Sequence, residues 1–129
     1  SDKLGELYKK LTPGDLYKEE KLNKIMARPF LSSVAIIVCM KRGDNEKIPE
    51  IEEVEAVACA IQNMCLTATA YGLGSFWSSP KIIYSKEMNS YLNIRKQDKC
   101  LGILYLGYTT IDWPKGQRKP IEYLTDWND

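Results

Sequence analysis

The chain has 129 residues, of which 44% are hydrophobic, 27% charged and 10% aromatic, a composition typical of one folded domain and not of a disordered chain. Eighteen basic and seventeen acidic residues leave a formal charge of +1, which argues against the concentrated basic surface that binds nucleic acid or an anionic membrane. The chain has no histidine, so its own residues cannot build a Ser/His/Asp or Cys/His catalytic centre.

Four cysteines occur in the chain, and none of them belongs to a Cys-x-x-Cys pair. Each lies within an apolar stretch, so we interpret them as small core side chains in a reducing compartment. The longest apolar run is too short for a membrane helix, and the amino end lacks an apolar signal segment. We therefore expect residues 1–129 to form a single cytoplasmic domain without a metal site. The cysteines are Cys39, Cys59, Cys65 and Cys100.

Two amphipathic helices are predicted at the amino end. Leucines at helical spacing predict a first helix over Asp2 to Leu11. Pro13 and Gly14 interrupt this pattern, and Asp15 is expected to cap a second helix that ends before Pro29. The apolar stripe of the second helix consists of Leu16, Leu22, Ile25 and Met26.

Continuous apolar runs predict two buried strands. The first run is Ser33 to Met40, which is rich in β-branched residues, and the second is Cys100 to Tyr108. Because the first strand is apolar on both faces, we expect it in the middle of a covered sheet. In the second strand, Gly102 and Gly107 should allow another part of the chain to approach the backbone closely. A shorter aromatic strand is expected over Ser75 to Ser79.

A long helix is predicted after the first of these strands. Pro49 suits the first helical turn, acidic residues follow it, and the next residue that breaks a helix is Gly72. Beyond Val54 this helix is apolar nearly all round, so it should have two packing partners. We expect one partner to be the sheet and the other a second subunit. The two apolar stripes are Val57, Ile61 and Cys65 on one side, and Ala56, Ala60, Met64 and Ala68 on the other.

The glycines at positions 72 and 74 at first suggest a phosphate-binding loop. The dinucleotide-binding fingerprint, however, follows a strand and opens a helix, whereas these glycines follow a helix. We therefore interpret Gly72 as a helix C-cap and Gly74 as the entry into the next strand. Ser85 is then expected to begin a brief helix.

Two further segments could bind a ligand. Trp77, Ser78 and Ser79 place a flat aromatic ring beside two hydroxyls and turn amides, which suits the edge of a planar heteroaromatic ligand. A buried strand end with turn serines is the more usual explanation. Arg118 lies in a basic cluster within the irregular tail over residues 109–129, where a guanidinium could contact a phosphate. A solvated tail is the more usual explanation there.

Several segments together resemble the FMN-dependent nitroreductase family, in particular its small single-domain branch. They are Lys47–Pro49, Ala58–Met64, Ala70–Ser79 and Lys96–Tyr108. The resemblance implies an α+β fold with three layers, α/β/α, around a central mixed and largely antiparallel sheet. It also implies a homodimer that shares the long helix and binds FMN at the subunit interface. The amino-terminal phosphate anchor of the family is absent, so we expect residues 1–129 to be the carboxy-terminal two-thirds of such a domain; a natural short form is the alternative.

This resemblance implies roles for the ligand-binding candidates. Trp77, Ser78 and Ser79 would line the flavin ring, chiefly through backbone groups, and Arg118 would bind the FMN phosphate. The implied enzyme transfers hydride from NAD(P)H to FMN and then reduces a nitroaromatic, a quinone or a similar small acceptor, with no catalytic side chain that the sequence identifies. The alternatives are a flavin-binding or structural homologue without turnover, and another flavin reaction on the same scaffold.

Overall fold

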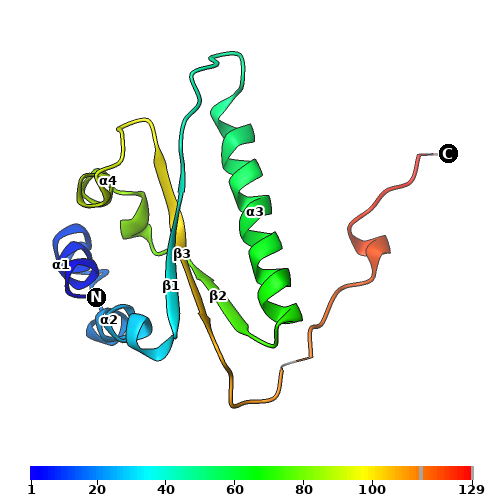
Figure 1. Ribbon diagram of the computed structural model, residues 1–129, viewed down its shortest axis with the longest axis horizontal. Helices are drawn as coiled ribbons and strands as arrows, with labels where there is room; N and C mark the ends of the chain where they lie inside the picture. The colour runs from blue at the N-terminus through cyan, green and yellow to red at the C-terminus, as the bar shows by residue number, and fades with distance from the viewer. Residues whose placement is uncertain (114, 129) are drawn as a thin grey trace.

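An antiparallel sheet separates the two helical faces of the molecule, as the computed structural model of residues 1–113 and 115–128 shows (Figure 1). Its strands are β1 (Val34–Met40), β2 (Gly74–Ser78) and β3 (Lys99–Gly107), in the order β1-β3-β2. Helices α1 (Asp2–Leu11), α2 (Glu19–Leu31) and α4 (Lys86–Leu92) lie on one face, and α3 (Glu50–Ala70) lies on the other. The three-layer α/β/α class is therefore confirmed, with antiparallel pairing at both junctions of the described sheet.

Strand β3 is the centre of the sheet, and its side chains from Cys100 to Tyr105 are buried. The expectation that the strand over Ser33 to Met40 is central is wrong, because β3 takes β1 and β2 as its two neighbours and leaves β1 at an edge. Val34 and Ile37 of β1 are 49% and 43% exposed. A run of β-branched residues indicates that the segment forms a strand, but it does not indicate whether that strand has a neighbouring strand on each side.

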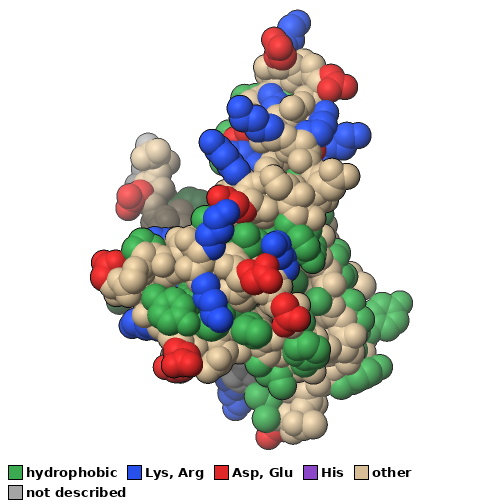
Figure 2. Space-filling view, turned by 90° about the vertical axis from the view of Figure 1, so that its left-hand side faces the viewer, with side chains coloured by type: hydrophobic (Ala, Val, Ile, Leu, Met, Phe, Trp, Pro, Cys, Tyr) green, Lys and Arg blue, Asp and Glu red, His purple; other side chains and the backbone are tan. Residues whose placement is uncertain are grey.

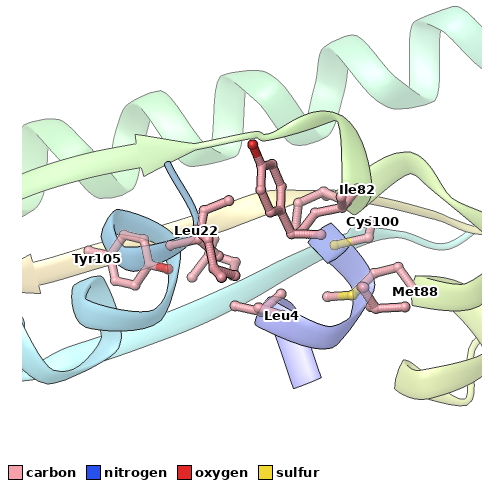
Figure 3. Close-up of a cluster of buried hydrophobic side chains, with 11 residues drawn as sticks. Leu4, Leu22, Ile82, Met88, Cys100 and Tyr105 are labelled. Carbon is pink, nitrogen blue, oxygen red and sulfur yellow. The ribbon is translucent and has the colours of Figure 1, made fainter. Parts of the chain in front are cut away.

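The main core lies between the sheet and the helices α1, α2 and α4 (Figure 3). Leu4 and Leu22 come from the two amino-terminal helices, and Met88 comes from α4. They meet Ile82 of the short helix η1 (Lys81–Tyr84) and Cys100 of β3. Residues that are distant in the sequence thus pack together and exclude water from one face of the sheet.

Helix α3 covers the other face with one of its two predicted stripes. Ile61 is completely buried, and it forms a second core with Met40 of β1 and Leu101 of β3. Val57 and Cys65 pack against this core, as expected of the first stripe. The second stripe is divided, because Ala56 and Ala60 are exposed, Met64 is partly buried and Ala68 is buried. The outward side of α3 is open to solvent, and there Ala56, Ala60 and Leu66 lie among polar residues.

The end of α3 and the start of α4 are both predicted correctly from nearby residues. Gly72 has a φ of +72°, and the N–H of Leu73 donates to the carbonyl of Ala68 at 2.8 Å, which confirms Gly72 as a C-cap. The hydroxyl of Ser85 accepts a hydrogen bond from the N–H of Met88 at 3.1 Å, so the predicted cap of α4 is also confirmed.

The boundaries predicted for the second helix are wrong at both ends. Helix α2 begins at Glu19 and not after Asp15, because the Tyr8 hydroxyl accepts from the N–H of Lys18 at 3.2 Å and fixes the chain just before the helix. The helix also continues through Pro29 to Leu31. A proline removes one helical hydrogen bond and its ring crowds the carbonyl four residues earlier, but Pro29 stands in the last turn, where only two helical residues follow it. The predicted irregular tail is confirmed over residues 109–113 and 115–128, apart from the short helix η2 (Ile121–Tyr123).

A cluster of charged groups ties the loop after β1 to the turn before β3. The Asp98 carboxylate accepts from the backbone N–H of Arg42 at 2.9 Å and from the Arg95 guanidinium at 2.8 Å. The Arg95 guanidinium also donates to the carbonyl of Arg42 at 2.6 Å, and the Arg42 guanidinium pairs with Glu53 of α3. Charged side chains crowd the top of the molecule in Figure 2, where Figure 1 places the loop between β1 and α3. No helix in the described residues could cross a membrane.

Asp98 should make the stability of the fold depend on pH. Its hydrogen bonds with Arg95, and further bonds from backbone N–H groups, lower the pKa of the carboxyl to about 2. The unfolded chain binds this proton more readily, so the stabilisation is complete above the unfolded pKa and is lost as the pH falls through about 4 toward about 2. Urea unfolding from about pH 6 to about pH 2.5 should show this loss in the native chain.

Asp98→Asn should lower the free energy of unfolding at neutral pH and flatten its pH dependence in the acid range. Asp15→Asn is the matched control, because Asp15 lies exposed in the turn before α2. An acid-range pH dependence that Asp98→Asn leaves unchanged would assign the stabilisation to another carboxylate.

Candidate functional site

The indole of Trp77 is held at the surface of the sheet by a hydrogen bond to the backbone. Its Nε1–H donates to the carbonyl oxygen of Leu101 at 3.0 Å, while the side chain stays 41% exposed. The sheet supplies this acceptor because the register between β1 and β3 shifts at Val38 and Cys39, next to Leu101. Such a bulge takes a residue out of regular pairing. The indole is therefore a fixed, partly open aromatic surface.

Gly102 is the residue that permits this placement. Its φ is +141°, which side chains rarely adopt, and a Cβ there would meet the Trp77 indole and would lie 2.8 Å from the carbonyl oxygen of Ser78. The expected close approach at Gly102 is thus confirmed. At Gly107 a Cβ would lie 3.4 Å from the backbone nitrogen of Ser33, so the chain also passes closely there.

Ser78 is anchored from the opposite side of β2. It is 6% exposed, and its Oγ accepts a hydrogen bond from Nη1 of Arg28 at 3.0 Å. The Arg28 guanidinium also lies over the Phe76 ring, 4.8 Å from the ring centroid. Sequence analysis missed Arg28. It lies 50 positions before Ser78, in the last turn of α2, and only the tertiary fold brings the two together.

Ser79 is exposed and follows directly after β2. Because β3 lies on one side of β2 and the described residues place no strand on the other, the outer edge of β2 presents unpaired backbone groups. The Trp77–Ser79 segment thus combines a flat aromatic surface with backbone donors and acceptors at a sheet edge.

Arg118 lies apart from this segment. It is exposed, as are its neighbours Lys115 and Lys119, and the tail that carries it leads away from the sheet (Figure 1). Trp77, Ser78 and Ser79 thus form one continuous segment, whereas Arg118 belongs to the tail that leads away from the sheet (Figure 1). Its role as a phosphate ligand stays a prediction.

The cysteines fit the core interpretation with one exception. Burial raises the pKa of the Cys100 thiol to about 11, and it also raises the pKa of Cys39, so both thiols are protonated at neutral pH. Cys65 is partly buried, whereas Cys59 is exposed on α3, so for Cys59 the interpretation is wrong. The described residues contain no cluster of cysteines and carboxylates that could hold a metal ion.

Comparison with known proteins places these features in a family context. A family model described as "Nitroreductase family" matches residues 3–108. The Escherichia coli (strain K12) protein named "Putative NAD(P)H nitroreductase YdjA" is 33% identical over 89 residues, which are 69% of this chain and 49% of the relative. A Bacillus subtilis protein named "Putative NAD(P)H nitroreductase YfhC" is 29% identical over 73 residues, 57% of this chain and 37% of that protein. The chain thus spans half or less of the length of these curated relatives.

Solved structures share the fold. The crystal structure of a nitroreductase-like family protein from Bacillus cereus superimposes with a TM-score of 0.74 at 24% identity, covering 97% of this chain and 66% of that one. The crystal structure of a Parabacteroides distasonis protein named "Putative NADH dehydrogenase/NAD(P)H nitroreductase" gives a TM-score of 0.56 at 18% identity, covering 98% of this chain and 67% of that one.

Proposed function

Because the chain belongs to the nitroreductase family, we propose that it acts as an FMN-dependent NAD(P)H oxidoreductase that reduces nitroaromatics, quinones or similar small acceptors. The observation that carries the proposal is the match of the family model across residues 3–108, which include the Trp77–Ser79 segment and its exposed indole. Because the chain covers half or less of its curated relatives, their whole activity comes to this chain only as a proposal.

Residues of β2 and the residue after it are proposed to contact the flavin ring. A planar heteroaromatic ring needs a flat apolar surface and hydrogen-bonding groups along its rim. Trp77 supplies the surface, and its indole is already fixed to Leu101, so binding would cost little side-chain freedom. The backbone of Ser78 and Ser79 supplies the rim contacts. When bound, FMN would supply the hydride chemistry, taking electrons from NAD(P)H and delivering them to the acceptor.

The side chains of the chain itself then have positioning roles. Arg28 holds the Ser78 hydroxyl, and Gly102 leaves the space that the Trp77 indole occupies, so together they fix the backbone that would contact the ring. Arg118 is proposed to bind the FMN phosphate, which requires the tail to move toward β2. A guanidinium is well suited to a phosphate because it can donate two parallel hydrogen bonds.

The proposed function is tested by the visible spectrum of the protein mixed with FMN, followed by addition of NADH or NADPH. We expect a bound flavin spectrum that bleaches with the reduced nicotinamide and recovers with a nitroaromatic or a quinone. A bound spectrum that never bleaches would favour the flavin-binding homologue without turnover. Absence of FMN binding would contradict the proposal.

Ser79 variants test whether backbone groups make the contact. Ser79→Pro removes the N–H and restricts φ, whereas Ser79→Ala removes only the hydroxyl. Fluorescence titration with FMN should therefore show weaker binding for Ser79→Pro and nearly native binding for Ser79→Ala. Equal and negligible effects of the two changes would place the flavin elsewhere.

Arg118→Ala tests the proposed phosphate contact. A hydrogen bond to a charged group contributes roughly 1.5 to 3 kcal/mol, so FMN affinity should fall by about tenfold to a hundredfold. Riboflavin lacks the phosphate and is the matched control ligand, whose affinity should change little. Equal losses for both flavins would mean that Arg118 acts through the structure of the tail, and no loss for FMN would favour Lys115 or Lys119.

A homodimer built on α3 is part of the proposal. The outward side of the helix is rich in small residues such as Ala56 and Ala60, and Leu66 is 59% exposed there. On the tail, Trp113 and Trp127 are 52% and 78% exposed. Small and apolar side chains exposed on a long helix suit close packing against a second subunit.

Ala60→Glu should disrupt this dimer without unfolding the subunit, because Ala60 is exposed and glutamate is a good helix former. Multi-angle light scattering should show a dimer for the native chain and monomers or irregular aggregates for the variant. Asn23→Glu adds the same charge at an exposed position of α2 and should leave the dimer intact. An intact dimer in Ala60→Glu, and in a further variant that also carries Ala56→Glu, would refute α3 as the interface.

A further inference from the structure

A cleft of about 480 Å³ opens where β2 begins, β3 ends and the last turn of α2 passes over them. It lies on the α2 side of β2, as the contact between Arg28 and Phe76 shows. Successive side chains of a strand point to opposite faces, so Trp77 points away from this cleft. The cleft is therefore separate from the proposed flavin surface, and its volume is within the range of small-molecule pockets.

Arg28 brings a positive charge to the cleft without a counter-ion. The side chain is partly buried, and its guanidinium is held by Ser78 Oγ at 3.0 Å and by the Phe76 ring. The bond to Ser78 uses one of the five N–H groups that a guanidinium carries. Among the described residues, no carboxylate lies within ion-pair distance of Arg28, in contrast to Arg42 and Arg95. A fixed guanidinium of this kind is suited to a planar oxyanion.

The uncharged side chains that line the cleft indicate the chemical character of the part of a ligand that does not contact Arg28. Phe76 is 52% exposed and Tyr108 is 83% exposed, and both line the cleft together with Leu31 of α2. Tyr105 lies behind them, and burial raises the pKa of its phenol, with the Arg28 charge partly opposing the shift. Tyr105 is thus protonated at neutral pH and can donate a hydrogen bond. Aromatic and aliphatic walls around one cation favour a flat apolar body over a small inorganic ion.

We propose that this cleft binds a small aromatic carboxylate, whose carboxylate pairs with Arg28 and whose ring packs among Phe76, Leu31 and Tyr108. This ligand would be bound in addition to FMN, and the proposed flavin chemistry does not require it. Bidentate pairing with the guanidinium provides the specificity for a carboxylate, and the apolar walls exclude anions without a ring.

The test uses 2-naphthoate as the probe and 2-naphthamide as its neutral counterpart. Calorimetric titration should detect binding of 2-naphthoate, with 2-naphthamide at least about tenfold weaker, because only the anion pairs with the cation. In spectra of the ¹⁵N-labelled protein, the probe should shift the amides of Gly74, Ser75 and Gly107, which line the cleft. Equal affinity for the two probes, or shifts confined to other parts of the chain, would overturn the proposal.

Arg28→Gln should weaken 2-naphthoate binding by roughly tenfold to a hundredfold. Lys24→Gln is the matched control, because Lys24 is an exposed cation on the same helix that pairs with Glu20 and does not line the cleft. Since Arg28 also anchors Ser78, a second variant leaves that bond intact. Thr110→Trp fills the cleft from an exposed position, and it too should abolish binding.

Unchanged 2-naphthoate affinity in folded Arg28→Gln or in Thr110→Trp would overturn the proposed site. Repeating the titration with FMN present separates this site from the flavin site. Loss of 2-naphthoate binding in Thr110→Trp with an unchanged FMN titration supports a separate cleft. Displacement of the probe by FMN in the native chain would contradict that separation.

Discussion

The irregularity in the pairing of β3 with β1 is the constraint on which the rest of the structure depends. Strand β3 pairs with both β1 and β2, so an irregularity in its backbone can affect the pairing with either neighbour. At Leu101 the regular ladder is interrupted, and the carbonyl oxygen there accepts from the Trp77 indole. Gly102 adopts the φ that this arrangement needs and leaves the volume that the indole fills. One backbone deviation thus creates the aromatic surface beside which the candidate site lies.

The elements that local chemistry decides could be predicted from the sequence. The long helix from Glu50, the C-cap at Gly72 and the buried strand after Lys99 all follow from periodicity, dipole preferences and glycine conformation. The grouping of Trp77 with Ser78 is also local, because the two residues are neighbours in the chain. These features need no knowledge of what packs against them.

The features that could not be predicted all depend on tertiary contacts. Strand β1 lies at an edge of the described sheet because β3 pairs with both β1 and β2. Helix α2 begins late because the Tyr8 hydroxyl accepts a hydrogen bond from the N–H of Lys18. The Arg28 contact with Ser78 joins positions 50 residues apart, and nothing in the composition around Arg28 marks it as different from the other basic residues. Only the folded structure distinguishes these arginines. Arg42 and Arg95 pair with carboxylates, whereas Arg28 contacts an aromatic ring and a hydroxyl.

The open edge of β1 has a consequence for the behaviour of the chain in solution. In the described residues this edge carries unpaired backbone groups beside the exposed side chains of Val34 and Ile37. A strand of this kind is a template for adding strands from other molecules, and Lys41 just beyond β1 is the nearest charge that opposes such growth. Intermolecular β-sheet formation, and with it fibril or aggregate growth, therefore competes with the native assembly wherever that edge is left uncovered.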